Sequence, residues 1–157
     1  MKSRFVDLAA CFMLVIGSNL SPQASAATDT DAALTNFISA LNTSMPPRTD
    51  VAPVANAFAE NGVHHGVNQG PPQVGREQIT QFFVGFKDLF ADWTHTERSR
   101  LVQGNRGAWE GVVQGHDKQT GKLIKLPIVF LLEFDDQGKV REDRVYVDVH
   151  LIGEQVK

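Results

Sequence analysis

Cysteine is nearly absent from this sequence, since Cys11 is the single one among 157 residues. Cys11 lies in an N-terminal segment that we expect to be removed, so the mature chain has no disulfide, no thiol nucleophile and no thiolate metal ligand. The formal net charge is −3 and basic residues form no patch, which argues against nucleic acid as a partner. The sequence also lacks a Gly-rich phosphate loop and a G-x-S-x-G nucleophile motif.

Metal-ligand spacings are missing as well. The chain has five histidines, but no two of them follow a His-x-x-x-His spacing on a helix. His64 and His65 are adjacent, and neighbouring side chains on a strand point to opposite faces. We therefore predict no metal site, and no motif in the sequence implies a redox cofactor or any other cofactor.

The N-terminus has the features of an export signal. Two basic residues precede an apolar segment, residues 8–16, which is too short to cross a bilayer as a helix. Ala24-Ser25-Ala26 supplies the small residues of a cleavage site. We predict a cleaved signal peptide, residues 1–26, followed by one mature domain, residues 27–157. The mature protein is then periplasmic or secreted, with no membrane attachment after cleavage.

Helical periodicity fills the first half of the mature chain. Apolar residues recur at the spacing of one helix face: Leu34, Phe37, Ile38 and Leu41. Asp50 can cap a second helix that stops near Asn61-Gly62. Residues 76–90 have the broadest apolar face and predict a third helix, and the short segment 63–67 before it is expected to be extended.

After residue 90 the hydrophobic period changes from helical to strand-like. Four strands are predicted at residues 93–102, 106–116, 122–134 and 139–151, joined by short polar turns as an antiparallel meander. Pro127 lies inside the third of them and predicts a bulge or bend. Helices first and strands afterwards is the α+β order. We therefore predict a cone of three N-terminal helices packed on a strongly curved, mainly antiparallel sheet.

The last predicted strand alternates between a polar and an apolar row. The polar row is Arg144, Tyr146, Asp148 and His150; the apolar row is Val145, Val147, Val149 and Leu151. We expect the polar row to face the inside of the cone. The apolar row would then lie on the outer sheet face, where it predicts a homodimer interface.

The order of several short motifs resembles nuclear transport factor 2-like domains: Phe37-x3-Leu41-Asn42, then Phe58-Ala-Glu-Asn-Gly-Val-His-His65, then Gly75-Arg-Glu-x-Ile79-x2-Phe82-Phe83. Later motifs are similar to the SnoaL-like polyketide cyclase branch: Thr120-Gly-Lys122, Leu126-Pro127, Asp136-x-Gly-Lys139 and Tyr146-x-Asp148. The resemblance covers about residues 31–155. It implies the cone fold and a small, largely apolar molecule as ligand.

The resemblance also separates the enzyme branches of this superfamily. Phe37, Gly66 and Val129 stand where ketosteroid isomerases have their Tyr, their base and their second Asp, so that mechanism is excluded. SnoaL-like cyclases have an acid/base Asp on the last strand, at the position of Asp148. They also have a His on the preceding strand, and residues 126–134 contain none.

Asp148 is therefore the predicted catalytic residue. Apolar surroundings would raise its pKa toward the range of a general base, whereas pairing with Arg144 would make it structural. The predicted ligand-binding residues are His65, Trp93, Trp109, His116 and Tyr146. Ordinary packing or solvent exposure is the alternative for each, and only one of His64 and His65 can point inward.

Two functions fit these residues. One is a cofactor-independent enzyme that catalyses acid/base isomerisation, cyclisation or dehydration through Asp148. The other is a non-catalytic ligand-binding or dimeric assembly module. A deep pocket with Asp148 at its base favours the enzyme; a filled cone or an Arg144–Asp148 pair favours the module.

Overall fold

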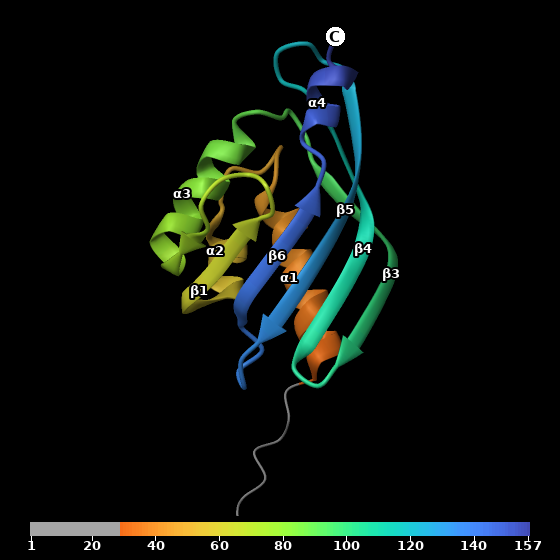
Figure 1. The fold of residues 1–157 in the computed structure, drawn as a ribbon. Coiled ribbons are helices and arrows are strands. Elements are labelled where there is room, and N and C mark those ends of the chain that lie inside the picture. Colours follow the sequence, from red (N-terminus) through yellow and green to blue (C-terminus); the bar gives the residue numbers. More distant parts are fainter. Residues whose placement is uncertain (1–28) are drawn as a thin grey trace, which may run out of the picture.

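The chain folds into helices packed on a single six-stranded sheet (Figure 1). The structure is a computed structural model that describes residues 29–157, so the predicted signal peptide and its cleavage site lie outside the described residues. The helices are α1 (Thr30–Ser44), α2 (Ala52–Ala57), α3 (Gly75–Lys87) and α4 (His150–Gln155). The strands are β1 (Phe58–Gly66), β2 (Gln73–Val74), β3 (Thr94–Gln103), β4 (Arg106–His116), β5 (Leu123–Phe134) and β6 (Val140–Val147). Along the chain, β1 and β2 lie between α2 and α3. Within this part of the chain, no helix has the length and apolar character needed to cross a membrane.

The sheet has the strand order β2-β1-β6-β5-β4-β3. Strands β3 to β6 form the predicted antiparallel meander, and β1 adds to β6 in parallel, with β2 antiparallel beyond it. The α+β class, the three N-terminal helices and the mainly antiparallel sheet are confirmed. The parallel β1–β6 contact was not predicted, because it joins segments about 80 residues apart in the chain.

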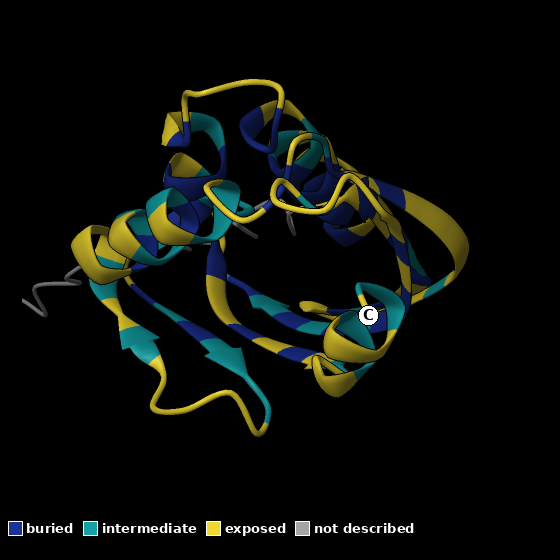
Figure 2. Cartoon of the chain, turned by 90° about the horizontal axis from the view of Figure 1, so that it is seen from above, coloured by how far each residue is buried: buried dark blue, intermediate teal, exposed yellow. Residues whose placement is uncertain are grey.

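The core lies between α1 and the inner face of the sheet. Helix α1 contacts β3, β4 and β5, and in Figure 1 it lies behind the sheet. Its first turn is capped by Asp29, whose Oδ1 accepts hydrogen bonds from the backbone N–H groups of Asp31 and Ala32. Phe37 on α1 packs edge to face against Phe58 and Phe130. The buried residues, dark blue in Figure 2, gather toward this interior.

Several element boundaries differ from the predictions, and two of them bear on the site. Helix α2 ends at Ala57 instead of continuing to Asn61, because Phe58 begins β1 and is fully buried in the core. Strand β6 ends at Val147, and the chain then turns into α4 instead of remaining extended to Leu151. Asp148 promotes this turn, since its side chain accepts a hydrogen bond from the backbone N–H of His150.

The bulge predicted at Pro127 is also wrong. Pro127 pairs in unbroken register with Val112 of β4, and the register shifts lie elsewhere, between Phe58 and Val63, Glu97 and Ser99, and Glu133 and Phe134. Pairing with β6 starts one residue later, at Ile128. Pro127 is therefore at a local sheet edge, where a missing backbone donor is tolerated.

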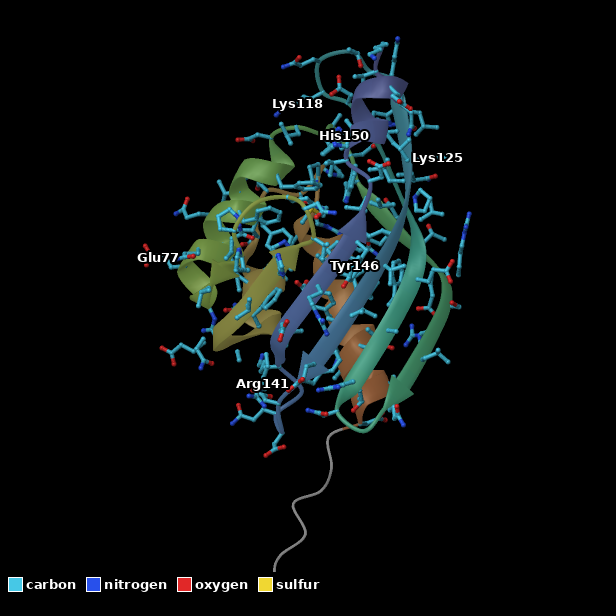
Figure 3. All side chains as sticks on the ribbon, viewed as in Figure 1. Glu77, Lys118, Lys125, Arg141, Tyr146 and His150 are labelled. Carbon is cyan, nitrogen blue, oxygen red and sulfur yellow. The ribbon has the colours of Figure 1, made fainter. Side chains whose placement is uncertain are left out.

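The two faces of β6 are the reverse of the prediction. Val145 is buried and Val147 is half-buried on the inner face, while Arg144 and Tyr146 are exposed. Figure 3 shows Tyr146 on the sheet face turned away from α1. The inner face of β6 borders the apolar core and the pocket and therefore takes the valines, whereas water solvates the charged row. The apolar row consequently cannot form the predicted outer interface.

Candidate functional site

A pocket of about 70 Å³ lies between the helices and the inner face of the sheet. Its aromatic lining comes from α3, the following loop and β5: Phe82, Phe83, Phe86, Trp93 and Phe130. Polar side chains in the lining are His64, Gln69 and His95, and the remaining residues are apolar. Ligand pockets in proteins are commonly lined in this way, with a few polar groups set in an apolar wall.

His64 and Asp143 form a buried pair at this pocket. His64 Nδ1 lies 2.8 Å from Asp143 Oδ1, and the two side chains are 5% and 0% exposed. The same oxygen accepts a longer hydrogen bond of 3.4 Å from the backbone N–H of His65. Because Oδ1 faces two nitrogen groups, we assign Asp143 as the acceptor and His64 Nδ1 as the proton donor. Nε2 of His64 is then the nitrogen left for a ligand.

The unusual β1–β6 pairing brings these two residues together. His64 and Asp143 are direct partners in the parallel register. Just before them, β1 bulges between Phe58 and Val63, and Gly62 passes so close to β6 that a Cβ there would lie 2.8 Å from the carbonyl oxygen of Val140. A glycine at this position therefore permits the strand contact on which the pair depends.

Aromatic rings hold the imidazole of His64 in place. Its ring centroid lies 4.4 Å from that of Phe82 and 5.3 Å from that of Phe83. Asp143 Oδ2 is enclosed and has no hydrogen-bond partner among the described residues. A buried carboxylate that orients a histidine also stabilises the imidazolium formed when Nε2 takes a proton. The arrangement is therefore suited to proton transfer at Nε2.

His95 is the second histidine of the pocket. It lies on β3 and is 8% exposed, and Asn42 of α1 contacts both its ring and its backbone. Burial disfavours the charged imidazolium and lowers the pKa of His95 from 6.5 to about 4. His95 is therefore neutral at physiological pH. Its ring contacts the amide of Asn42, whereas the ring of His64 contacts a carboxylate.

Asp148 lies outside the pocket. It follows the end of β6, is exposed, and uses Oδ1 to accept the backbone N–H of His150 at 3.0 Å. The apolar surroundings on which its predicted basicity depended are absent at this position. The alternative ion pair is also not formed, because Arg144 Nε lies 3.5 Å from Glu142 instead. Asp148 and Tyr146 border a separate depression of about 380 Å³ beside the 67–68 loop.

The structure distributes the other predicted ligand residues over different regions. Trp93 lines the pocket, and its role in ligand binding stays a prediction. Trp109 is buried in the core, where its indole N–H donates to Glu97 Oε2 at 2.7 Å. His65 is half-buried, and strand alternation places its side chain on the opposite face from His64. The expectation that His65 points inward is therefore wrong.

His116 is at the rim and half-exposed. Its Nδ1 lies 2.8 Å from Asp92 Oδ2, and this hydrogen bond is the main cause that lowers the pKa of Asp92. His116 is not among the residues that line the pocket. His116 and Asp92 therefore form a solvated pair at the surface. In residues 29–157, no three His, Cys, Asp or Glu side chains gather as a metal site would require.

Sequence reasoning missed Asp143, although a signal for it was present. Asp143 has the same strand parity as Val145 and Val147, so it is the polar end of the apolar row. It was hidden in the charged run 141–144, which reads as a solvated surface. His64 was one of the two adjacent histidines considered for an inward orientation, but alternation alone does not show which of the two faces the core. His95 has the strand parity of Trp93, and this signal was overlooked.

The fold and pocket define a class of protein: a nuclear transport factor 2-like α+β cone with an apolar cavity at its centre. The sequence model of the SnoaL-like domain matches residues 34–143, and the chain belongs to this family. None of the curated proteins matches the sequence significantly.

Solved structures share the fold at low sequence identity. A hypothetical protein from Catenulispora acidiphila with a ketosteroid isomerase-like fold, solved with trimethylamine, has a TM-score of 0.70 and 20% identity over 79% of this chain and 91% of that chain. A proposed polyketide cyclase from Xanthomonas campestris pv. campestris has a TM-score of 0.68 and 22% identity, covering 82% and 96%. A proposed SnoaL-like polyketide cyclase from Jannaschia sp. has a TM-score of 0.64 and 15% identity, covering 78% and 92%. These similarities establish the fold alone.

Proposed function

We propose that this protein binds a small, largely apolar molecule in the cone and transfers a proton to or from it through His64. The observation that carries the proposal is the 2.8 Å contact between His64 Nδ1 and the fully buried Asp143, with Phe82 and Phe83 against the imidazole. The family and the cyclase-like neighbours support cyclisation, isomerisation or dehydration as the reaction class. His64 takes the acid/base role that the sequence assigned to Asp148.

The proton step follows from the orientation of the pair. Asp143 accepts the Nδ1 proton, so the lone pair of His64 is on Nε2. A ligand C–H next to a carbonyl loses its proton to Nε2, and the electron pair passes into the carbonyl as an enolate. The resulting imidazolium, stabilised by Asp143, returns the proton to carbon or oxygen. A positioned base of this type contributes about 10²- to 10⁴-fold to the rate.

A direct test uses cyclohexanone as a minimal carbonyl probe. Exchange of its α-protons in D₂O, followed by NMR, reports proton abstraction without knowledge of the natural substrate. We expect exchange above the buffer rate with the intact protein and loss of the excess rate in His64→Gln. Asp143→Asn should reduce it by about tenfold or more, because the imidazole is no longer oriented.

Two matched variants serve as controls. His116→Gln removes the other histidine–aspartate pair, which is on the surface, and should leave exchange unchanged. Asp148→Asn should also leave it unchanged. Loss of exchange in Asp148→Asn with full activity in His64→Gln would overturn the assignment of His64 and support Asp148. Native mass spectrometry of freshly purified protein would identify a retained ligand.

A second candidate function is a non-catalytic dimeric module, which one feature of the outer sheet face supports. Leu101, Ala108 and Leu131 are register partners across β3, β4 and β5, and they border a shallow groove of about 310 Å³. Leu101 is 76% exposed. We propose a homodimer through this row instead of the valine row of β6. Sedimentation of a clean monomer at micromolar concentration would contradict it, and Leu101→Lys should weaken a dimer that does form.

Export remains part of the proposal. The basic start, the apolar segment 8–16 and Ala24-Ser25-Ala26 support cleavage after Ala26 and a periplasmic or secreted mature protein. N-terminal sequencing of the protein from an extracellular or periplasmic fraction tests it. A mature chain that begins at Ala27 is the expected result, and an intact N-terminus in the cytoplasm would contradict it.

A further inference from the structure

His95 contributes a polar group that the proposed proton transfer does not use. It lines the same pocket as His64 but lies on β3. Its ring is surrounded by aromatic groups, with centroid distances of 5.9 Å to Phe130, 6.3 Å to Trp109 and 6.4 Å to Trp93. A buried imidazole in such surroundings requires a defined hydrogen-bond partner for each polar nitrogen.

Asn42 determines which ring nitrogen of His95 carries the proton. Asn42 Oδ1 accepts the backbone N–H of His95 at 2.8 Å, and Asn42 Nδ2 donates to the backbone carbonyl of His95 at 3.3 Å. A backbone N–H can only donate and a carbonyl can only accept, so the orientation of the amide is fixed. The same Oδ1 lies 3.1 Å from His95 Nδ1. Nδ1 therefore faces an acceptor and bears the proton.

The opposite nitrogen, Nε2, is consequently an acceptor. Burial lowers the pKa of His95 to about 4, so the ring carries one proton at neutral pH and Nε2 keeps its lone pair. Among the described residues, no hydrogen bond to Nε2 is formed. Among the described residues, Asp143 Oδ2 is the one side-chain nitrogen or oxygen atom that is both fully enclosed and without a hydrogen-bond partner. His95 Nε2 also has no partner, so it is not fully enclosed and is accessible from the pocket that His95 lines.

We infer that His95, oriented by Asn42, is a specificity residue that accepts a hydrogen bond from a ligand hydroxyl. The pocket then selects small apolar compounds that carry a hydroxyl group, such as phenols or enols. An isosteric ligand with a methyl group in place of the hydroxyl leaves the buried acceptor unpaired. This inference rests on the proposed binding of a small molecule in the cone.

Phenol and toluene are matched probes, since they share the ring and differ by a hydroxyl against a methyl group. The dissociation constants of both can be measured by NMR titration of the purified protein at pH 7. We expect phenol to bind about tenfold more tightly than toluene. Equal affinity for the two would overturn the inference while leaving pocket binding intact. Failure of both to bind would contradict the proposed small-molecule pocket itself.

The variant His95→Phe removes the acceptor and keeps an aromatic ring in the site. Asn42 retains its two backbone hydrogen bonds in this variant, which supports folding. We expect phenol affinity to fall to that of toluene, with toluene affinity unchanged. The surface variant His116→Phe is the matched control and should preserve the phenol preference. A preference that persists in His95→Phe would overturn the assignment, since a purely structural histidine does not set a hydroxyl preference.

Imidazole ¹⁵N spectra of the wild-type protein give a test that needs no variant. Long-range ¹H–¹⁵N correlations distinguish a protonated from an unprotonated ring nitrogen. We expect protonated Nδ1 and unprotonated Nε2 in His95, with an Nε2 signal that moves on addition of phenol and not on addition of toluene. A proton on Nε2 in the free protein would overturn the inference.

Discussion

Two histidine–aspartate pairs in this protein have the same length and opposite environments. His64–Asp143 and His116–Asp92 both have a nitrogen–oxygen distance of 2.8 Å. The side chains of the first pair are 5% and 0% exposed, and those of the second are 47% and 48% exposed. Only His64 lines the pocket. Distance alone therefore does not identify a functional pair, because desolvation decides how strongly the two groups depend on each other.

The largest expected difference between the pairs is in stability. His64→Ala leaves the Asp143 carboxylate buried without its ring partner and should lower the free energy of unfolding by about 3–5 kcal/mol. His116→Ala should lower it by less than about 1 kcal/mol, since water solvates Asp92. Urea unfolding measures both. Adding Asp143→Ala to His64→Ala should recover part of the loss, and strictly additive losses would show that the buried pair is not coupled.

The pH dependence of His95 sharpens the comparison, since this histidine is buried without a carboxylate. Its pKa is about 4 in the folded protein against 6.5 for an unperturbed histidine, so the unfolded chain binds a proton first as the pH falls. The free energy of unfolding should therefore fall by about 3 kcal/mol because of His95 as the pH drops from 6.5 to 4, and this loss is absent above pH 6.5. Urea unfolding across this range should show a smaller loss in His95→Phe. An identical pH profile in the variant would contradict the buried neutral state.

Gly115→Ala should disturb the surface pair without changing either of its side chains. A Cβ at this position would lie 2.2 Å from the carbonyl oxygen of Asp92 and 2.7 Å from the Trp93 ring, so the backbone must move. We expect a loss of about 1–3 kcal/mol in thermal or urea unfolding. Gly153→Ala in α4 is the control, because nothing lies within 4 Å of its Cβ position, and it should not destabilise. Equal effects of the two variants would contradict the close approach.

The smallest effect is expected from Asp92→Asn. The His116 hydrogen bond lowers the pKa of Asp92. The ionised Asp92 therefore adds to the free energy of unfolding above about pH 3.8, and this addition disappears as the pH falls through the folded-state pKa. The exposed pair should contribute at most about 1 kcal/mol, and less at high salt. Comparison of wild type and variant in low and 1 M NaCl measures this. A larger, salt-independent loss would show that the pair is not a surface pair in solution.

The parts of the fold that depend on local pattern were predictable. Turns and period-2 alternation indicated β3, β4, β5 and most of β6, and helical periodicity indicated α1 and α3. The parallel insertion of β1 beside β6 was not, since no local signal joins Phe58 to Val140. The end of β6 was predicted too late because the polar and apolar residues keep alternating after Val147. The backbone nevertheless leaves the sheet there, in the turn that Asp148 stabilises.

The site was less predictable than the fold, because it depends on the long-range pairing of β1 with β6 and on which face of β6 points inward. Trp93 does line the pocket. The face of β6, however, was assigned from the supposition that titratable groups line a pocket. The apolar requirement of the inner face is the stronger effect, and it places Asp148 and Tyr146 outside. Asp143 is tolerated on the inner face because its carboxylate contacts His64. His64 lies on β1, and the sequence does not reveal that β1 pairs with β6.

The C-terminal helix α4 has a consequence for how copies of the protein meet in crowded conditions. Where β6 stops short, the backbone of Lys125 on β5 would be an open edge available to a strand from another molecule. The side-chain amide of Gln155 occupies that edge instead, accepting from Lys125 N–H at 2.8 Å and donating to its carbonyl at 3.1 Å. One glutamine thus imitates a residue of the missing strand. Helix α4 thereby fills the hydrogen-bonding positions that an added strand would need at Lys125.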